Sequence, residues 1–132
     1  MDFNSILQTH FSCAYPVEHW RGKGNILYYM GRYKKSLRAY NHALKIDPQS
    51  DISLSGKALT LTKLKRYTEA LEHFDQAIRI NGDVAEYWTG KGLVLYRMGR
   101  FLEARKTLNE SLNLDPRNSL TSRYLKLVLK KR

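Results

Sequence analysis

Residues 88–116, WTGKGLVLYRMGRFLEARKTLNESLNLDP, decide the fold of this chain. The stretch contains two helix-length segments that meet at Met98-Gly99-Arg100. Apolar side chains recur in steps of three and four along both segments, which keeps them on one face of a helix. Gly92 lies inside the first segment, where a glycine costs roughly 0.5–1 kcal/mol relative to alanine. We therefore expect a neighbouring helix to approach closely at this glycine.

The same arrangement returns twice at a spacing of 34 residues, which places Trp20, Leu54 and Trp88 at equivalent positions. The agreeing positions are Trp20, Lys23, Gly24, Leu27, Gly31, Tyr33, Tyr40, Ala43, Leu44 and Pro48 in the first copy and Leu54, Lys57, Ala58, Leu61, Leu64, Tyr67, Ala70, Phe74, Ala77 and Ile78 in the second. This pattern resembles the tetratricopeptide repeat (TPR) family. The resemblance covers residues 17–118 and implies an all-α fold, a right-handed α-solenoid of stacked antiparallel helix pairs.

The spacing divides the chain into five segments. Three repeats are predicted at residues 17–50, 51–84 and 85–118, between an N-terminal leader at 1–16 and a basic C-terminal capping helix at 119–132. We expect helices near residues 17–30, 33–46, 51–64, 67–80, 85–98, 101–114 and 119–131. The leader carries a short apolar stripe of Phe3, Ile6, Leu7 and Phe11. It is expected either to cover the first repeat as a short packing helix, or to be a flexible or partner-binding segment, or to mediate self-association.

Turn-forming residues separate the predicted helices. Asp-Pro pairs end the second helix of the first and third repeats, because proline lacks the backbone N–H and disfavours a helical residue before it. Asn81-Gly82 does so in the second repeat, where a left-handed conformation is available. Lys65 stands where the other two repeats have a glycine between their helices. The predicted N-caps are Ser50, Asp83 and Asn118.

Length and composition exclude several classes of protein. The 132 residues fit one domain, and no stretch approaches the roughly 18 uninterrupted apolar residues that read as a membrane span. The N-terminal residues have no basic region and no long apolar run, so no secretory signal is expected. Cys13 is the only cysteine. A single cysteine excludes an internal disulfide and suits a reducing compartment, so we expect a cytoplasmic protein without membrane partners.

The polar residues do not suggest catalysis. No two of the four histidines, His10, His19, His42 and His73, have the i, i+4 spacing that places two imidazoles on one helix face. The Gly-Lys-Gly fragments at 22–24 and 90–92 lie inside predicted helices and recur with the repeat, so they do not form a phosphate-binding loop. We expect no metal, no cofactor and no enzyme activity.

The formal net charge of +11 is distributed unevenly. Residues 17–50 carry seven Lys and Arg against two acids, residues 51–84 carry five against five, and residues 85–118 carry six against four. The last fourteen residues carry five cations and no acid. Both ends of the array are therefore basic around a neutral middle, which favours anionic partners and speeds their encounter.

In TPR proteins the first helix of each pair lines the inner, concave surface, so the resemblance places a groove there. The implied groove residues are Arg21, Asn25, Tyr28, Tyr29, Leu59, Lys63, Leu93, Tyr96, Arg97, Arg123 and Tyr124. Tyrosine gives a large contact area at low entropic cost, and arginine can hold a carboxylate through two hydrogen bonds. Gly22, Gly56 and Gly90 share one repeat position, either as tolerated small residues or as an open floor that a ligand backbone can approach.

One TPR subfamily grips the C-terminal carboxylates of chaperone tails with lysine, asparagine and arginine side chains. Arg21 and Asn25 fit the first two positions of that set. Gly56, Glu86 and Gly90 occupy later positions, and Glu86 would repel a carboxylate. The sequence therefore does not favour this specific function.

The leading hypothesis is a protein–protein interaction scaffold, a monomer or weak homodimer, that holds a peptide or helix of a partner in the concave groove. Acidic side chains on that ligand would suit the groove's cations. A nucleic-acid-binding (RNA) module is the runner-up, since basic and aromatic residues together can follow a phosphate backbone and stack bases. An oligomerisation element that joins protomers is the third hypothesis.

Overall fold

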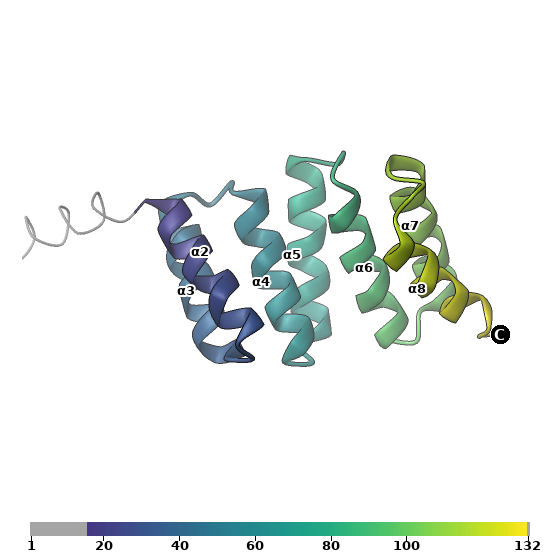
Figure 1. Ribbon diagram of the computed structural model, residues 1–132, viewed down its shortest axis with the longest axis horizontal. Helices are drawn as coiled ribbons and strands as arrows, with labels where there is room; N and C mark the ends of the chain where they lie inside the picture. The colour runs from purple at the N-terminus through teal and green to yellow at the C-terminus, as the bar shows by residue number, and fades with distance from the viewer. Residues whose placement is uncertain (1–15, 132) are drawn as a thin grey trace, which may run out of the picture.

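The computed structural model describes residues 16–131, and every regular element among them is a helix (Figure 1). The predictions for the leader fall almost entirely on residues 1–15 and lie outside the described residues. The helices are α2 (Val17–Tyr29), α3 (Tyr33–Ile46), α4 (Asp51–Lys63), α5 (Tyr67–Ile80), α6 (Ala85–Arg97), α7 (Phe101–Leu114) and α8 (Ser119–Leu129).

The helices stack side by side in chain order, as Figure 1 shows. Each packs against the next, and the first helix of each pair also contacts the first helix of the following pair, from α2 through α4 and α6 to α8. The predicted all-α solenoid of three helix pairs plus a capping helix is thus confirmed. The seven helices begin at the predicted residues, and the first helix of each pair ends one residue earlier than expected.

Side-chain caps fix two of the predicted helix starts. The Ser50 hydroxyl accepts a hydrogen bond from the Ser53 backbone N–H at 3.2 Å, and the Asn118 side chain accepts one from Thr121 at 3.1 Å. The prediction of Asp83 as a cap is wrong. Val84 occupies the N-cap of α6 and makes no side-chain hydrogen bond there, because the repeat register places the cap one residue after the aspartate.

The turn inside each helix pair requires a left-handed residue. Gly31 and Gly99 have φ of 77° and 78°, and Lys65 takes the same role in the second pair with φ of 62°. Lys65 is the one non-glycine residue with positive φ among the described residues, and a side chain at such a position costs roughly 1–2 kcal/mol. Gly82 has no such conformation, so the left-handed turn expected there is absent.

Large side chains from the second helices fill the space beneath the first helices. Phe74 is fully buried with Ala58, Leu61 and Val94, and Leu108 is fully buried in the next layer. A Cβ built on Gly92 would lie 2.6 Å from Leu108, so the predicted close approach at Gly92 is confirmed. These contacts hold consecutive pairs in one continuous core.

Two of the three equivalent glycines owe their size to packing below them. A side chain on Gly56 would overlap the ring of Tyr40, and one on Gly90 would overlap the ring of Phe74. A Cβ on Gly22 would meet no atom of residues 16–131 within 4 Å. An aromatic ring from the preceding second helix therefore accounts for the small residue at Gly56 and at Gly90. The reading of these positions as an open floor for a ligand stays a prediction.

Candidate functional site

The first helices and the capping helix together line a groove. Its main pocket has a volume of about 460 Å³ and is built by α2, α4, α6, α8 and two adjoining turn residues. The lining residues are Tyr28, Tyr29, Ser55, Leu59, Thr62, Lys63, Lys65, Glu86, Thr89, Gly90, Leu93, Arg97, Asn118, Leu120 and Tyr124. We call this surface, with the smaller pocket described next, the inner groove.

A smaller pocket of about 290 Å³ continues the inner groove between α2 and α4. It shares Ser55 and Leu59 with the main pocket, so the two adjoin along α4. Its lining residues are Glu18, Arg21, Gly22, Asn25, Tyr40, Ile52, Ser55, Gly56 and Leu59. The first helices therefore present one connected surface rather than separate hollows.

Nine of the eleven predicted groove residues line these two pockets. Tyr28, Tyr29, Leu59, Lys63, Leu93, Arg97 and Tyr124 line the main pocket, and Arg21 and Asn25 line the smaller one. Arg123 is exposed and lines neither. Tyr96 is partly buried, packs against the core around Leu95 and Leu108, and has its ring centroid 5.7 Å from that of Phe101.

Four lining residues lie neither on the first helices nor among the eleven expected residues: Lys65, Asn118 and Leu120 in the main pocket and Tyr40 in the smaller one. Lys65 and Asn118 lie in turns that flank the first helices, and Leu120 lies in the first turn of α8. A signal for Leu120 was present, because it continues the 34-residue series of Ile52 and Glu86 into the capping helix. Lys65 and Asn118 lie outside the first helices to which the expectation was confined.

Opposite charges lie at the two edges of the inner groove. The first helices run in the same direction, so their C-terminal ends share one edge, where Lys63, Lys65 and Arg97 gather. Their N-terminal ends share the other edge, where Glu18 and Glu86 lie together with one cation, Arg21. The C-terminal edge is therefore cationic, while the N-terminal edge carries the acidic residues of the groove.

Apolar side chains cover the surface between these edges, where Leu59 and Leu93 lie on neighbouring helices. Two tyrosines, Tyr28 and Tyr29, end α2 at the same edge as Lys63 and Arg97, and Tyr29 is 79% exposed. The Tyr28 ring makes edge contacts with Tyr29 and Tyr33 at centroid distances of 5.3 and 5.7 Å. Burial, and then the proximity of other phenols, raises the pKa of Tyr28 above its ordinary value.

Hydroxyl groups below the groove are used internally. Thr62 donates a hydrogen bond to the Ala58 carbonyl at 2.8 Å. The Thr89 hydroxyl lies 2.7 Å from both the Ser111 and Thr121 hydroxyls, which joins α6, α7 and α8 in one buried network. Because these groups are already paired, they fix the walls of the groove and leave ligand recognition to the rings, leucines and charged side chains.

Neither a metal-binding cluster nor a membrane-spanning helix is found among the described residues. Among residues 16–131 no group of three or more histidine, cysteine, aspartate and glutamate side chains is arranged to hold a metal ion. Within the same range no helix has the length and hydropathy needed to cross a bilayer.

Solved structures with this architecture include two that hold peptides. The TPR domain of Arabidopsis OM64 superposes with a TM-score of 0.84 at 21% identity, covering 88% of this chain and 96% of that one. The first TPR of Spaghetti (RPAP3), bound to the HSP90 peptide SRMEEVD, has a TM-score of 0.83 at 20% identity, covering 86% and 90%. The second TPR domain of human RPAP3, in complex with the HSP70 peptide SGPTIEEVD, has a TM-score of 0.81 at 22% identity, covering 92% and 98%.

These identities are low, so the structural similarity by itself shows only the fold. No curated protein sequence matches the chain significantly. The family model for the tetratricopeptide repeat matches residues 17–81 and again 49–117, which together span the three helix pairs. On the combined evidence of the repeated helix pairs and this match, the chain belongs to the tetratricopeptide repeat family.

Proposed function

We propose that the chain is a scaffold whose inner groove binds a peptide or helix of a partner protein, with an acidic group of that ligand at the cationic edge. The observation that carries the proposal is the main pocket, where Leu59 and Leu93 lie between Lys63 and Arg97 on one side and Glu86 on the other.

The chemistry of the groove fits a polypeptide. Exposed leucines and tyrosines accept apolar side chains, while arginine and lysine at one edge accept carboxylates. TPR domains are generally non-catalytic interaction modules, and two of the similar structures contain bound peptides. We place this binding in the cytoplasm and expect the chain to act as a monomer or weak homodimer.

The ligand is not expected to be held as a chaperone tail is held. The clamp positions taken by Gly56 and Gly90 lie over Tyr40 and Phe74, and a longer side chain at either would overlap those rings. Glu86 also lines the pocket and repels a terminal carboxylate there. The carboxylate-binding side chains of this groove are instead Lys63 and Arg97, at the opposite edge.

Affinity capture from the native cell, followed by binding of synthetic peptides from the captured partner, tests the proposal. The variant Leu59→Ser/Arg97→Glu alters the floor and the cationic edge together, and we expect it to weaken peptide binding by roughly a hundredfold, since each lost contact is worth about 1–2 kcal/mol. Tyr96 is a poor choice of probe, because truncating it also removes core packing.

The matched control is Leu102→Ser/Arg105→Glu on α7, which makes the same chemical changes at exposed residues that line neither groove pocket. Binding that survives in the control and disappears in the groove variant supports the proposal. Equal binding by the groove variant and the wild type would refute it. A steep salt dependence with generic RNA, without peptide binding, would favour the nucleic-acid hypothesis instead.

A further inference from the structure

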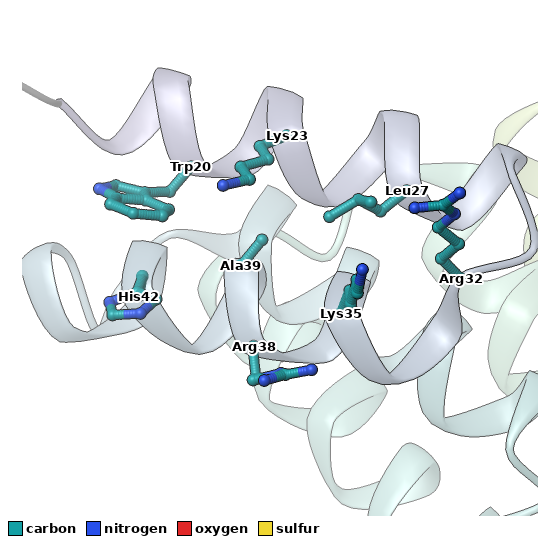
Figure 2. A pocket seen from close by; sticks show the side chains of 8 residues that line it. All are labelled: Trp20, Lys23, Leu27, Arg32, Lys35, Arg38, Ala39 and His42. Atoms are coloured by element: carbon teal, nitrogen blue, oxygen red, sulfur yellow. The ribbon is translucent and has the colours of Figure 1, made fainter.

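A second surface with ligand-binding character lies between α2 and α3, away from the inner groove. Figure 2 shows its main pocket, of about 470 Å³, where side chains of α2 face side chains of α3. The lining residues are Trp20, Lys23, Leu27, Arg32, Lys35, Arg38, Ala39 and His42. An adjoining pocket of about 560 Å³ shares Arg38 and His42 with it and adds Asn41, Leu44, Lys45 and Lys57. We call these two pockets the basic α2/α3 face.

None of the residues lining the basic α2/α3 face is acidic. The other two helix pairs differ from the first, because they have acidic residues at the equivalent positions. In the second pair Arg66 forms an ion pair with Glu69 at 2.8 Å. In the third pair Arg100 forms the same ion pair with Glu103 at 2.6 Å. The first pair keeps the arginine as Arg32 but has Lys35 where the glutamate stands, so the neutralising partner is replaced by a second cation.

The first helix pair also lacks a second acidic ion-pair partner that a later repeat has. Lys91 of α6 forms an ion pair with Asp75 of α5 at 2.7 Å. One repeat earlier the aspartate is replaced by Asn41, which lines the face together with Lys57. Among residues 16–131 every ion pair lies in the second and third repeats. The first helix pair therefore has the arginine and lysine framework of its neighbours without their acids.

The pocket also has an apolar floor. Leu27 and Ala39 lie between the cations, as Figure 2 shows. The Trp20 ring is stacked on His42 with centroids 4.4 Å apart, and the Lys23 ammonium lies 5.5 Å from the centre of the same ring. The floor thus accepts an aliphatic side chain, while the rim carries Arg32, Lys35 and Arg38.

We propose that the basic α2/α3 face binds an acidic, amphipathic segment of a partner protein. One apolar side chain of that segment rests on Leu27 and Ala39, and carboxylates on either side pair with Arg32, Lys35 and Arg38. The ligand supplies the negative charges that Glu69 and Glu103 supply within the other repeats. Arginine binds carboxylates through paired hydrogen bonds, which gives the contact geometry as well as charge.

A peptide fits this face better than a nucleic acid does. Single-stranded nucleic acids gain much of their affinity by stacking bases on aromatic rings, and the two rings that line this face, Trp20 and His42, are already stacked on each other. The phosphate backbone also has no aliphatic group for the floor at Leu27. The site shares no lining residue with the inner groove, so it operates whether or not the inner groove binds a peptide.

Fluorescence anisotropy with a labelled peptide of repeated Glu-Glu-Leu units tests the proposal on the full chain. The variant Lys35→Glu/Arg38→Glu introduces the residues that the second repeat already has at these positions, Glu69 and Glu72, so the fold should be retained and circular dichroism checks it. We expect binding to weaken about tenfold or more, because the new glutamates repel the carboxylates of the peptide.

Two control variants separate this site from general electrostatics and from the inner groove. Lys130→Glu/Lys131→Glu makes the same charge change at the exposed end of the chain, and Lys63→Glu/Arg97→Glu makes it at the cationic edge of the groove. Lys130→Glu/Lys131→Glu should bind the Glu-Glu-Leu peptide far better than Lys35→Glu/Arg38→Glu. Lys63→Glu/Arg97→Glu removes any share of binding that the inner groove contributes, so Lys35→Glu/Arg38→Glu should still weaken binding when it is added to that variant. A matching Glu-Glu-Ser peptide should bind the wild type more weakly than the Glu-Glu-Leu peptide.

Several results would overturn the proposal. Equal losses in Lys35→Glu/Arg38→Glu and Lys130→Glu/Lys131→Glu would show an effect of net charge alone. A loss confined to Lys63→Glu/Arg97→Glu would assign the peptide to the inner groove and leave that proposed function intact. Equal binding of the Glu-Glu-Leu and Glu-Glu-Ser peptides would show that the apolar floor does not contribute to binding. Tighter binding of an oligouridine, or of vesicles containing phosphatidylserine, lost in the same variant, would assign the face to another class of partner.

Discussion

The first helix pair and the two that follow share a backbone but differ in how their charges are balanced. Arg32, Arg66 and Arg100 each stand at the start of a second helix. The latter two form an ion pair with a glutamate three residues on, and the first faces Lys35 instead. A repeat architecture therefore fixes where a side chain stands, while the identity of one residue decides whether that position is neutralised or offered to a partner.

The three helix pairs also differ in what lies beneath the glycine that they share at one position of the first helix. Gly56 and Gly90 each cover an aromatic ring from the preceding second helix, but Gly22 covers no side chain of the described residues within 4 Å. At the next step along the array the residue sizes are reversed. Leu108 of α7 takes the place of the aromatic residue, and Tyr124 of α8 takes the place of the glycine. Ring and glycine thus behave as a pair, which substitutions can test.

Replacing Gly90 by alanine should have the largest effect. The new methyl group overlaps Phe74, which is fully buried, and overpacking a core costs about 1–3 kcal/mol. Alanine's better helix propensity offsets part of this, so we expect a net loss of about 2 kcal/mol in urea unfolding. The variant Phe74→Leu, which copies Leu108, should reduce that loss by about 1 kcal/mol in a double-mutant cycle. If the effects of the two substitutions on the free energy of unfolding simply add, residues 74 and 90 are not coupled.

Alkaline pH should destabilise the fold through the ring beneath Gly56. Burial raises the pKa of Tyr40 to about 12, well above its ordinary value of 10.0 in an unfolded chain. The unfolded chain therefore releases this proton first, so stability is intact below pH 10 and falls as the pH rises through 12. Burial and the Asp51 carboxylate also raise the pKa of Tyr87, which adds to the slope. Unfolding at stepped pH should show a shallower decline for Tyr40→Phe, and an unchanged slope would contradict this assignment.

A substitution in the turn of the second helix pair should raise the stability of the protein. Lys65 has φ of 62°, and the equivalent residues Gly31 and Gly99 have the same backbone conformation without a side chain. Lys65→Gly should raise the free energy of unfolding by about 1 kcal/mol, because glycine adopts this region without strain. The reverse control, Gly99→Lys, should lower it by a similar amount. A destabilised Lys65→Gly protein would show that the lysine contributes more through its side chain than its backbone costs.

The smallest effect is expected at Gly22. Alanine there meets no neighbour among residues 16–131, so its helix propensity decides the outcome, and the protein should gain about 0.5 kcal/mol. Thermal unfolding beside Gly90→Ala gives a direct comparison of one substitution at two equivalent positions. A loss of stability at Gly22 would mean that this glycine, like the other two, covers a side chain.

The repeat spacing predicts most of the fold because each helix boundary has a local chemical cause. Ser50 and Asn118 cap helices, and glycines turn the chain in two of the three pairs. Asp83 was misread because local propensity favoured it, whereas the repeat register gave the capping position to Val84. Where the two signals disagree, the packing of whole helices decides the boundary.

The groove was predicted less completely, because a period says which helix face a residue occupies but not what fills the space beside it. Tyr28 and Tyr96 share a repeat position, yet Tyr28 lines the pocket and Tyr96 packs against Phe101. The excess of cations in the first repeat was visible in the sequence. Their lack of neutralising partners was not, because it emerges only beside the ion pairs of the later repeats.

The buried hydroxyls of Thr89, Ser111 and Thr121 have a consequence for recognition. Apolar contacts tolerate sliding of one helix along another, whereas hydrogen bonds of 2.7 Å form at only one separation. The capping helix is thereby held at a set distance from α6, and it carries Leu120 and Tyr124 on the end wall of the main pocket. An arriving ligand meets a wall that is already in place, so little of its binding energy is spent on ordering the receptor.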